Sequence, residues 1–167
     1  MRNNKLILAA CLAALSTGLY SASAAAASTT ANASANVITP LAISEVNGMD
    51  FGDVSVGTAG GTVVLDTTGG RTVTGDAEAV TGGTQAAGVY NVTGMGTKAY
   101  SISDPGSVII SSAGNNMTVN TFTHDAGATP ALTGGADTFN VGATLNINPS
   151  QPPGAYSGTY TLTINYQ

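Results

Sequence analysis

The chain has 167 residues and a formal net charge of −5, from 4 basic and 9 acidic side chains, with 1 histidine and 1 cysteine. So few cations cannot build a basic patch, which argues against electrostatic binding to nucleic acid or to anionic lipid. The single cysteine, Cys11, lies near the N-terminus, so the rest of the chain has no thiolate for catalysis or metal binding.

Residues 1–26 have the order of a secretory signal peptide, with positive charges at Arg2 and Lys5, an apolar stretch over 6–20 and then small residues. A lipoprotein cleavage at Cys11 is disfavoured because the apolar stretch continues beyond it. The stretch is shorter than the roughly 20 residues that a membrane span needs, and no later segment is apolar enough to span. We expect cleavage close to residue 26 and export through the periplasm to the cell surface or the extracellular space.

Residues 27–39 are expected to be either an N-terminal extension or the first strand of the domain that follows, residues 40–167. From position 31 to position 43, every odd residue is alanine, valine, threonine, leucine or isoleucine. This period-two alternation is typical of a β-strand with one buried face. Pro40 cannot donate a hydrogen bond to a neighbouring strand, so the segment is two short strands or one kinked strand.

Turn residues divide the domain into short segments whose apolar residues alternate. We expect turns at Gly60-Gly61 and Thr67–Gly70, and a hairpin closed by Asp104-Pro105-Gly106. No amphipathic helix is evident, so the sequence predicts an all-β fold, with antiparallel strands in a two-sheet sandwich. The expected strands cover residues 49–56, 62–66, 71–74, 88–93, 98–103, 107–111, 117–123, 138–148 and 156–166.

Candidate residues for catalysis or metal binding are few. His124 lies beside Asp125, but no G-x-S-x-G motif supplies a nucleophile for them. The acidic side chains of Asp50 and Asp53, like those near residue 76, are not part of a D-x-[DN]-x-[DN]-G calcium loop. The glycine runs lack the lysine of a phosphate-binding loop. We therefore expect a protein without enzymatic activity, catalytic residues, a metal site or a cofactor.

The clearest alternation lies at the C-terminal end, after Pro152-Pro153. Gly154 is fourteenth from the C-terminus, Tyr166 is penultimate, and the even positions between them are apolar or glycine. This arrangement resembles the C-terminal motif of chaperone–usher pilus subunits. Over roughly residues 33–166 the chain is also similar to a family of exported bacterial β-domains of unknown function. The residues that carry this second resemblance are Pro40-Leu41-Ala42-Ile43-Ser44, Met49-Asp50-Phe51-Gly52 and Gly154-Ala155-Tyr156-Ser157-Gly158-Thr159-Tyr160.

The pilus resemblance implies an immunoglobulin-like sandwich that lacks one strand and therefore has an apolar groove. A periplasmic chaperone would fill the groove first, and the N-terminal extension of a neighbouring subunit would replace it in the fibre. The residues that would contact the neighbour or the chaperone are Ala31, Ala33, Ala35 and Val37 on the donor strand, and Gly154, Tyr156, Tyr160, Leu162, Ile164 and Tyr166 on the C-terminal strand.

The expected function is thus a structural subunit of a pilus or fimbria. Its partners would be other copies or other pilus subunits, with a chaperone and an usher during assembly. The alternative is a self-contained secreted or surface-attached binding module, such as an adhesin or matrix protein, in which residues 31–43 are the domain's own first strand. The alanine-rich donor face favours the alternative, because a methyl group buries little apolar surface.

Overall fold

The computed structural model describes residues 25–167, so nearly all of the expected signal peptide lies outside the described part of the chain. The chain divides into two units, Met1–Asn36 and Val37–Gln167. In the first unit, residues 25–36 form neither helix nor strand. Among the described residues, no helix is long and apolar enough to cross a membrane.

The second unit is built from β-strands, and every pairing between them is antiparallel. Together with the absence of helices from residues 25–167, this confirms the all-β fold class, and the two sheets agree with a β-sandwich. The strands are β1 (Ala42–Asn47), β2 (Val54–Leu65), β3 (Arg71–Ala79), β4 (Gly88–Thr93), β5 (Tyr100–Ser103), β6 (Val108–Ser112), β7 (Asn115–His124), β8 (Ala136–Ile147) and β9 (Thr163–Tyr166).

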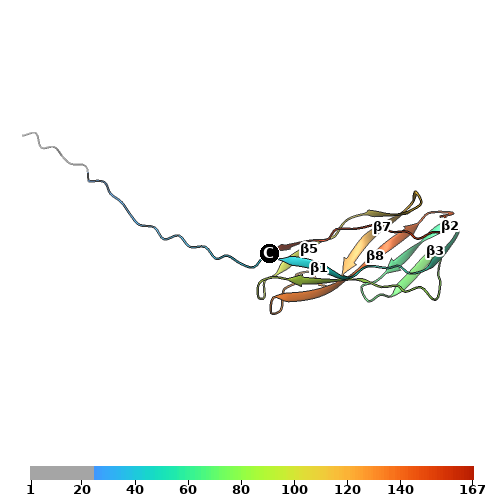
Figure 1. The fold of residues 1–167 in the computed structure, drawn as a ribbon, viewed down its shortest axis with the longest axis horizontal. Helices are drawn as coiled ribbons and strands as arrows, with labels where there is room; N and C mark the ends of the chain where they lie inside the picture. The colour runs from blue at the N-terminus through green and yellow to red at the C-terminus, as the bar shows by residue number, and fades with distance from the viewer. Residues whose placement is uncertain (1–24) are drawn as a thin grey trace, which may run out of the picture. The chain divides into compact units, whose positions relative to one another are not determined.

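Strand β8 is the centre of the larger sheet. Its residues 144–146 pair with both β2 and β7, so these two strands lie on opposite edges of β8. The first half of β8 pairs with β4, whose other neighbour is β1. β3 extends the sheet beyond β2, and β6 extends it beyond β7. Figure 1 shows β7 and β8 side by side, with β2 and β3 next to each other.

The core consists of two clusters of buried side chains, both of which include odd-numbered residues of β8. This placement follows from the period of two, because alternate residues of a strand point to the same face. Cluster 1 contains Val63, Ala77, Met117, Val119, Ala143, Leu145 and Ile147. Cluster 2 contains Tyr90, Val92, Tyr100, Leu132, Phe139 and Val141.

The prediction of a hairpin closed by Asp104-Pro105-Gly106 is wrong. This turn joins β5 to β6, but β5 pairs with β9 and β6 pairs with β7. The β6–β7 hairpin is closed instead by Ala113 and Gly114, whose φ angles of 47° and 85° are typical of a type I′ turn. A Pro-Gly turn changes the direction of the chain, but it does not determine which strands become neighbours.

The prediction of a turn at Gly60-Gly61 is also wrong, because β2 continues through these two residues. The register of β2 against β3 shifts between Val56 and Gly61, which marks a bulge. A Cβ atom on Gly60 would lie 2.7 Å from the carbonyl oxygen of Ile147, and the φ angle of Gly60 is 77°. Glycine is needed here for a bulge and for close contact with another backbone segment.

The turn expected at residues 67–70 is confirmed, and it joins β2 to β3. One oxygen of the Asp66 carboxylate, Oδ1, accepts hydrogen bonds from the backbone N–H groups of Thr68 and Gly70, at 2.8 and 2.7 Å. It also accepts the Thr68 hydroxyl at 2.7 Å. The aspartate thus replaces backbone hydrogen bonds that the reversing chain cannot make with itself.

Candidate functional site

The C-terminal segment, residues 154–166, contains most of the predicted contact residues. Ser157 exchanges two backbone hydrogen bonds with Ser111 of β6, at 2.9 and 3.1 Å, and the last residues pair with β5 as β9. Residues 158–162 between these points belong to no strand. The expected strand over 156–166 is therefore paired at its two ends, and only Thr163–Tyr166 forms a regular strand.

Side chains in this segment alternate as the sequence predicts, with the even positions other than Gly154 and Gly158 half-buried and the odd positions exposed. Tyr156 packs against cluster 1. The other four packing residues, Tyr160, Leu162, Ile164 and Tyr166, contact cluster 2. The structure thus divides the predicted contact residues between two parts of the core.

Gly154 and Gly158 allow the C-terminal segment to approach β6 closely. A Cβ atom on Gly154 would lie 2.6 Å from the Ser112 hydroxyl oxygen, and one on Gly158 would lie 2.5 Å from the Ile109 carbonyl oxygen. Glycine is thus required at both positions for packing within the domain.

The opposite edge of the segment has no strand beside it. Because Ser157 directs its N–H and C=O toward β6, its neighbours Tyr156 and Gly158 direct theirs the other way. Within residues 25–167, the backbone groups of 158–162 have no hydrogen-bond partner. An edge of this kind can pair with another extended chain.

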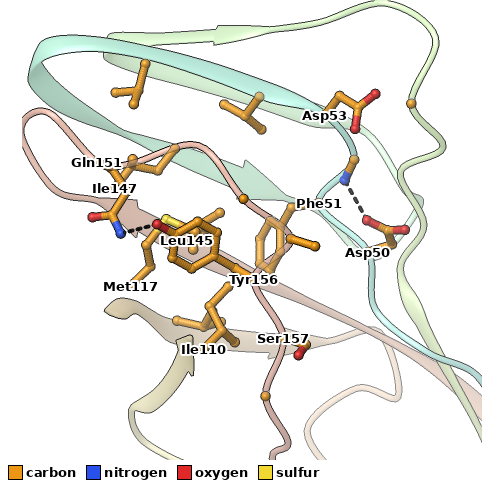
Figure 2. Close-up of a pocket in the computed structure, with 18 of the residues that line it drawn as sticks. Asp50, Phe51, Asp53, Ile110, Met117, Leu145, Ile147, Gln151, Tyr156 and Ser157 are labelled. Atoms are coloured by element: carbon orange, nitrogen blue, oxygen red, sulfur yellow. Dashed lines mark hydrogen bonds between the residues drawn. The ribbon is translucent and has the colours of Figure 1, made fainter. Parts of the chain in front are cut away.

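A groove with both apolar and polar side chains in its lining lies along this segment, with a volume of about 1100 Å³. One side is formed by residues 49–56 and the other by 151–160, and Val108 and Ile110 of β6 also line it. Figure 2 shows Leu145, Ile147 and Met117 of cluster 1 in this pocket together with Tyr156. This volume exceeds the range of about 300–1,000 Å³ that is typical of small-molecule sites. The groove is therefore large enough for a segment of polypeptide.

The side of the groove formed by residues 49–56 also has an unpaired backbone. Residues 54–56 pair with β3, but β2 begins to pair with β8 only at Gly61. The Met49–Asp53 stretch is held by other contacts: Asp50 Oδ1 accepts the Gly52 N–H at 2.8 Å, as Figure 2 shows. The groove is thus bordered by two unpaired edges, that of residues 54–56 on the side away from β3 and that of residues 158–162. Asp50, by contrast, exchanges two backbone hydrogen bonds with Ala86.

Arg71 fixes this side of the groove, a role that no sequence pattern predicts. Its guanidinium donates hydrogen bonds to the carbonyl oxygens of Phe51 and Asp53, at 2.8 and 2.9 Å, and to that of Val80 at 3.2 Å. A Cβ atom on Gly52 would lie 2.8 Å from Nη1 of the same guanidinium, so glycine is required there. Because arginine has five donors in a planar arrangement, one side chain can bond three backbone carbonyl oxygens and so join residues 51–53 to Val80.

The groove has an acidic rim and no basic side chain in its lining. Asp50 and Asp53 lie at one end, and neither Arg71 nor Lys98 lines the groove. Tyr160, which also lines the groove, accepts a hydrogen bond from the Tyr90 hydroxyl at 2.6 Å. Burial is the main cause that raises the pKa of Tyr160 above its ordinary value of 10, so this hydroxyl stays protonated near neutral pH.

The other candidate residues do not come together as a catalytic or metal site. The carboxylate of Asp125 accepts hydrogen bonds from the backbone N–H and side-chain amide of Asn140, at 2.7 and 2.8 Å. His124 Nδ1 is buried and has no hydrogen-bond partner among the described residues. Residues 25–167 contain no group of three or more His, Cys, Asp or Glu side chains that could hold a metal ion.

The expected donor residues lie at the N-terminal side. Ala31, Ala33 and Ala35 fall within residues 25–36, which form no strand. Val37 is the first residue of the second unit and is 93% exposed. The first regular strand, β1, begins only at Ala42, so residues 31–41 do not have the strand structure that their alternation predicts.

Comparison with known proteins assigns the chain to a family. Residues 41–166 match the family described as a domain of unknown function (DUF4402), and the chain therefore belongs to that family. Neither a curated protein nor a solved structure matches the chain.

Proposed function

We propose that this member of the DUF4402 family is a structural subunit of a pilus-like or fimbria-like fibre, and that its copies assemble by strand donation. The observation that carries the proposal is the groove beside cluster 1, which is bordered by the unpaired edges of residues 54–56 and 158–162. An inserted strand would supply backbone hydrogen bonds to these edges and apolar side chains to the groove. In this view the domain is an immunoglobulin-like sandwich that lacks one strand.

The gain in free energy on strand insertion comes from completing cluster 1. Nine partly buried hydrophobic side chains pack against the seven buried ones, and most of these nine line the groove. Fully burying one large apolar side chain is worth about 1.5–3 kcal/mol. Completing the burial of five half-buried side chains would thus contribute roughly 4–8 kcal/mol before the cost of ordering the donor.

The donor in this proposal is the segment Ser28–Val37 of a neighbouring copy. Residues 25–36 form no strand of their own, and residues 28–44 contain no ionisable side chain. Seven residues in extended form, from Ala31 to Val37, span roughly 23 Å at about 3.3 Å per residue. During export a periplasmic chaperone would occupy the same groove, and an usher would exchange it for the donor at the cell surface.

The alternative function is a self-contained secreted or surface-attached binding module, such as an adhesin or matrix protein. It is favoured by the two buried clusters, which form within residues 37–167 without any strand from residues 25–36. In this case the groove would bind an external ligand. Neither proposal requires an enzymatic activity or a cofactor.

Deletion of Ser28–Val37 tests the assembly. Surface extracts of the native host are separated on denaturing gels with and without boiling, for the full chain and for the deletion variant. Strand donation predicts high-mass species that dissociate on boiling for the full chain, and only monomer for the deletion variant. A variant with these ten residues replaced by an equally long Gly-Ser segment controls for chain length. Unchanged high-mass species in the deletion variant would rule out this donor.

A further inference from the structure

We infer that Tyr156 sets the size of the side chain that the groove admits, so that a donor strand must present a small residue opposite it. The alanine-rich face of the donor strand is then complementary in size to the groove. The strand that occupies the groove is the segment Ser28–Val37 of a second copy. The inference rests on the proposed function, because it specifies the strand that enters the same groove.

Tyr156 is a fixed part of the groove. Its hydroxyl donates a hydrogen bond to the Pro152 carbonyl oxygen at 2.7 Å and accepts one from Gln151 Nε2 at 2.8 Å. Figure 2 shows Tyr156 among Phe51, Leu145 and Ile147, with its hydroxyl directed to Gln151. Turning the ring out of the groove would break both hydrogen bonds and expose the apolar side chains beneath it.

Packing decides which donor residue fits beside this ring. Protein interiors are filled to the density of organic crystals, and large residues interdigitate with small ones across facing positions. The groove already contains three aromatic rings, those of Phe51, Tyr156 and Tyr160. We therefore expect the ring to crowd a donor leucine opposite Tyr156, and an alanine methyl group to leave room for the donor backbone to approach the unpaired edge.

Charge favours a second copy as the occupant. Asp50 and Asp53 line the groove, and Arg71 bonds two carbonyl oxygens of the same stretch. Its positive charge offsets part of the acidic charge, so an uncharged strand suits this side of the groove. The donor segment has no ionisable side chain, and its odd positions 31, 33 and 35 are all alanine. Both the size and the charge of this segment therefore fit the groove.

The experiment uses full-length chains in the native host and measures the amount of polymer that dissociates on boiling. Three variants each carry one larger donor residue: Ala31→Leu, Ala33→Leu and Ala35→Leu. We expect at least one of them to reduce polymer about tenfold or more, and Tyr156→Ala in the same chain to restore it. Tyr156→Leu serves as a second, less drastic enlargement of the groove if Tyr156→Ala does not fold.

Ser34→Leu is the matched control, because it adds a leucine on the opposite face of the donor strand and should leave polymer formation unchanged. The inference is overturned if all three alanine variants polymerise as well as the wild type, or if neither Tyr156 variant restores assembly. The proposed function would survive both of these results. Absence of polymer from the wild-type chain would instead overturn the proposed function, and the inference with it.

Discussion

Single side chains with several hydrogen bonds hold parts of this domain outside its regular strand pairing, and Asp66 in the turn between β2 and β3 is the best example. The three hydrogen bonds that its carboxylate accepts stabilise its charged form. As a result the pKa of Asp66 lies below its ordinary value of 3.8, with the Thr68 side chain as the largest cause, followed by the backbone N–H groups of Gly70 and Thr68. Arg71 likewise holds one side of the groove in place, through its hydrogen bonds to three carbonyl oxygens.

The lowered pKa of Asp66 predicts a pH-dependent contribution to stability. A carboxyl group with a lower pKa in the folded state stabilises that state above the unfolded pKa, and the contribution is lost as pH falls from about 4 through the folded pKa. Asp66→Asn should therefore be less stable than the wild type at pH 7, and the difference should shrink below about pH 4. Urea denaturation from pH 7 to pH 2 measures this.

Asp104→Asn is the control for this prediction, since the Asp104 carboxylate accepts no hydrogen bond among the described residues. Its unfolding free energy should follow that of the wild type through the acid range. If the curves for Asp66→Asn and wild type run parallel down to pH 2, the three hydrogen bonds do not act on the charge of Asp66.

Among the structural elements, the β6–β7 hairpin contains a strained residue. Ala113 has a φ angle of 47°, in the left-handed region that costs an alanine roughly 1–2 kcal/mol. Because Asn-Gly is the preferred pair in type I′ turns, Ala113→Asn should raise the free energy of unfolding by about 0.5–1 kcal/mol. Thermal and urea denaturation measure the change.

The following residue provides the opposite control for the hairpin. Gly114 has a φ angle of 85°, and a Cβ atom there would contact nothing within 4 Å. Gly114→Ala should thus destabilise the domain through backbone strain alone, by about 1 kcal/mol. A stabilising Gly114→Ala, or an Ala113→Asn without effect, would contradict the type I′ geometry.

The sequence predicted which face of a strand is buried better than it predicted which strands pair with each other. Alternation placed the buried side chains of β8 correctly, because a period of two is a local property of an extended chain. It could not show that β5 pairs with β9, since this pairing depends on which distant edge is free. The same limit applies to residues 158–162, whose alternation is regular although they pair with nothing. Arg71 was missed because its three partners are backbone carbonyls, which every residue has.

At the scale of the whole molecule, the two clusters differ in how completely they are closed. Tyr100 and Phe139 of cluster 2 are at most 1% exposed, and the Tyr100 hydroxyl donates to Asp137 at 2.7 Å. Cluster 1 is bordered by the groove, and apolar side chains in an open groove beside an unpaired edge favour aggregation. The domain should therefore gain both stability and solubility when a strand fills the groove.

A chain that carries its own donor strand at the C-terminal end would show this gain in stability. The Gln167 N–H donates to the Ala99 carbonyl oxygen at 3.1 Å, so the chain end is fixed beside β5, and the unpaired edge runs back from there. Moving Ser28–Val37 from the N-terminal side to a position after Gln167, through a turn of about four residues, would form an antiparallel hairpin along that edge. We expect a monomer whose Tm is roughly 5–10 °C above that of the chain without these ten residues, as about 2 kcal/mol would give.

The control carries the same addition with Ala33→Pro and Ala35→Pro, which removes two backbone donors and should abolish the increase in Tm. Equal Tm values for the self-completed chain and the proline control would mean that the groove does not accept this strand.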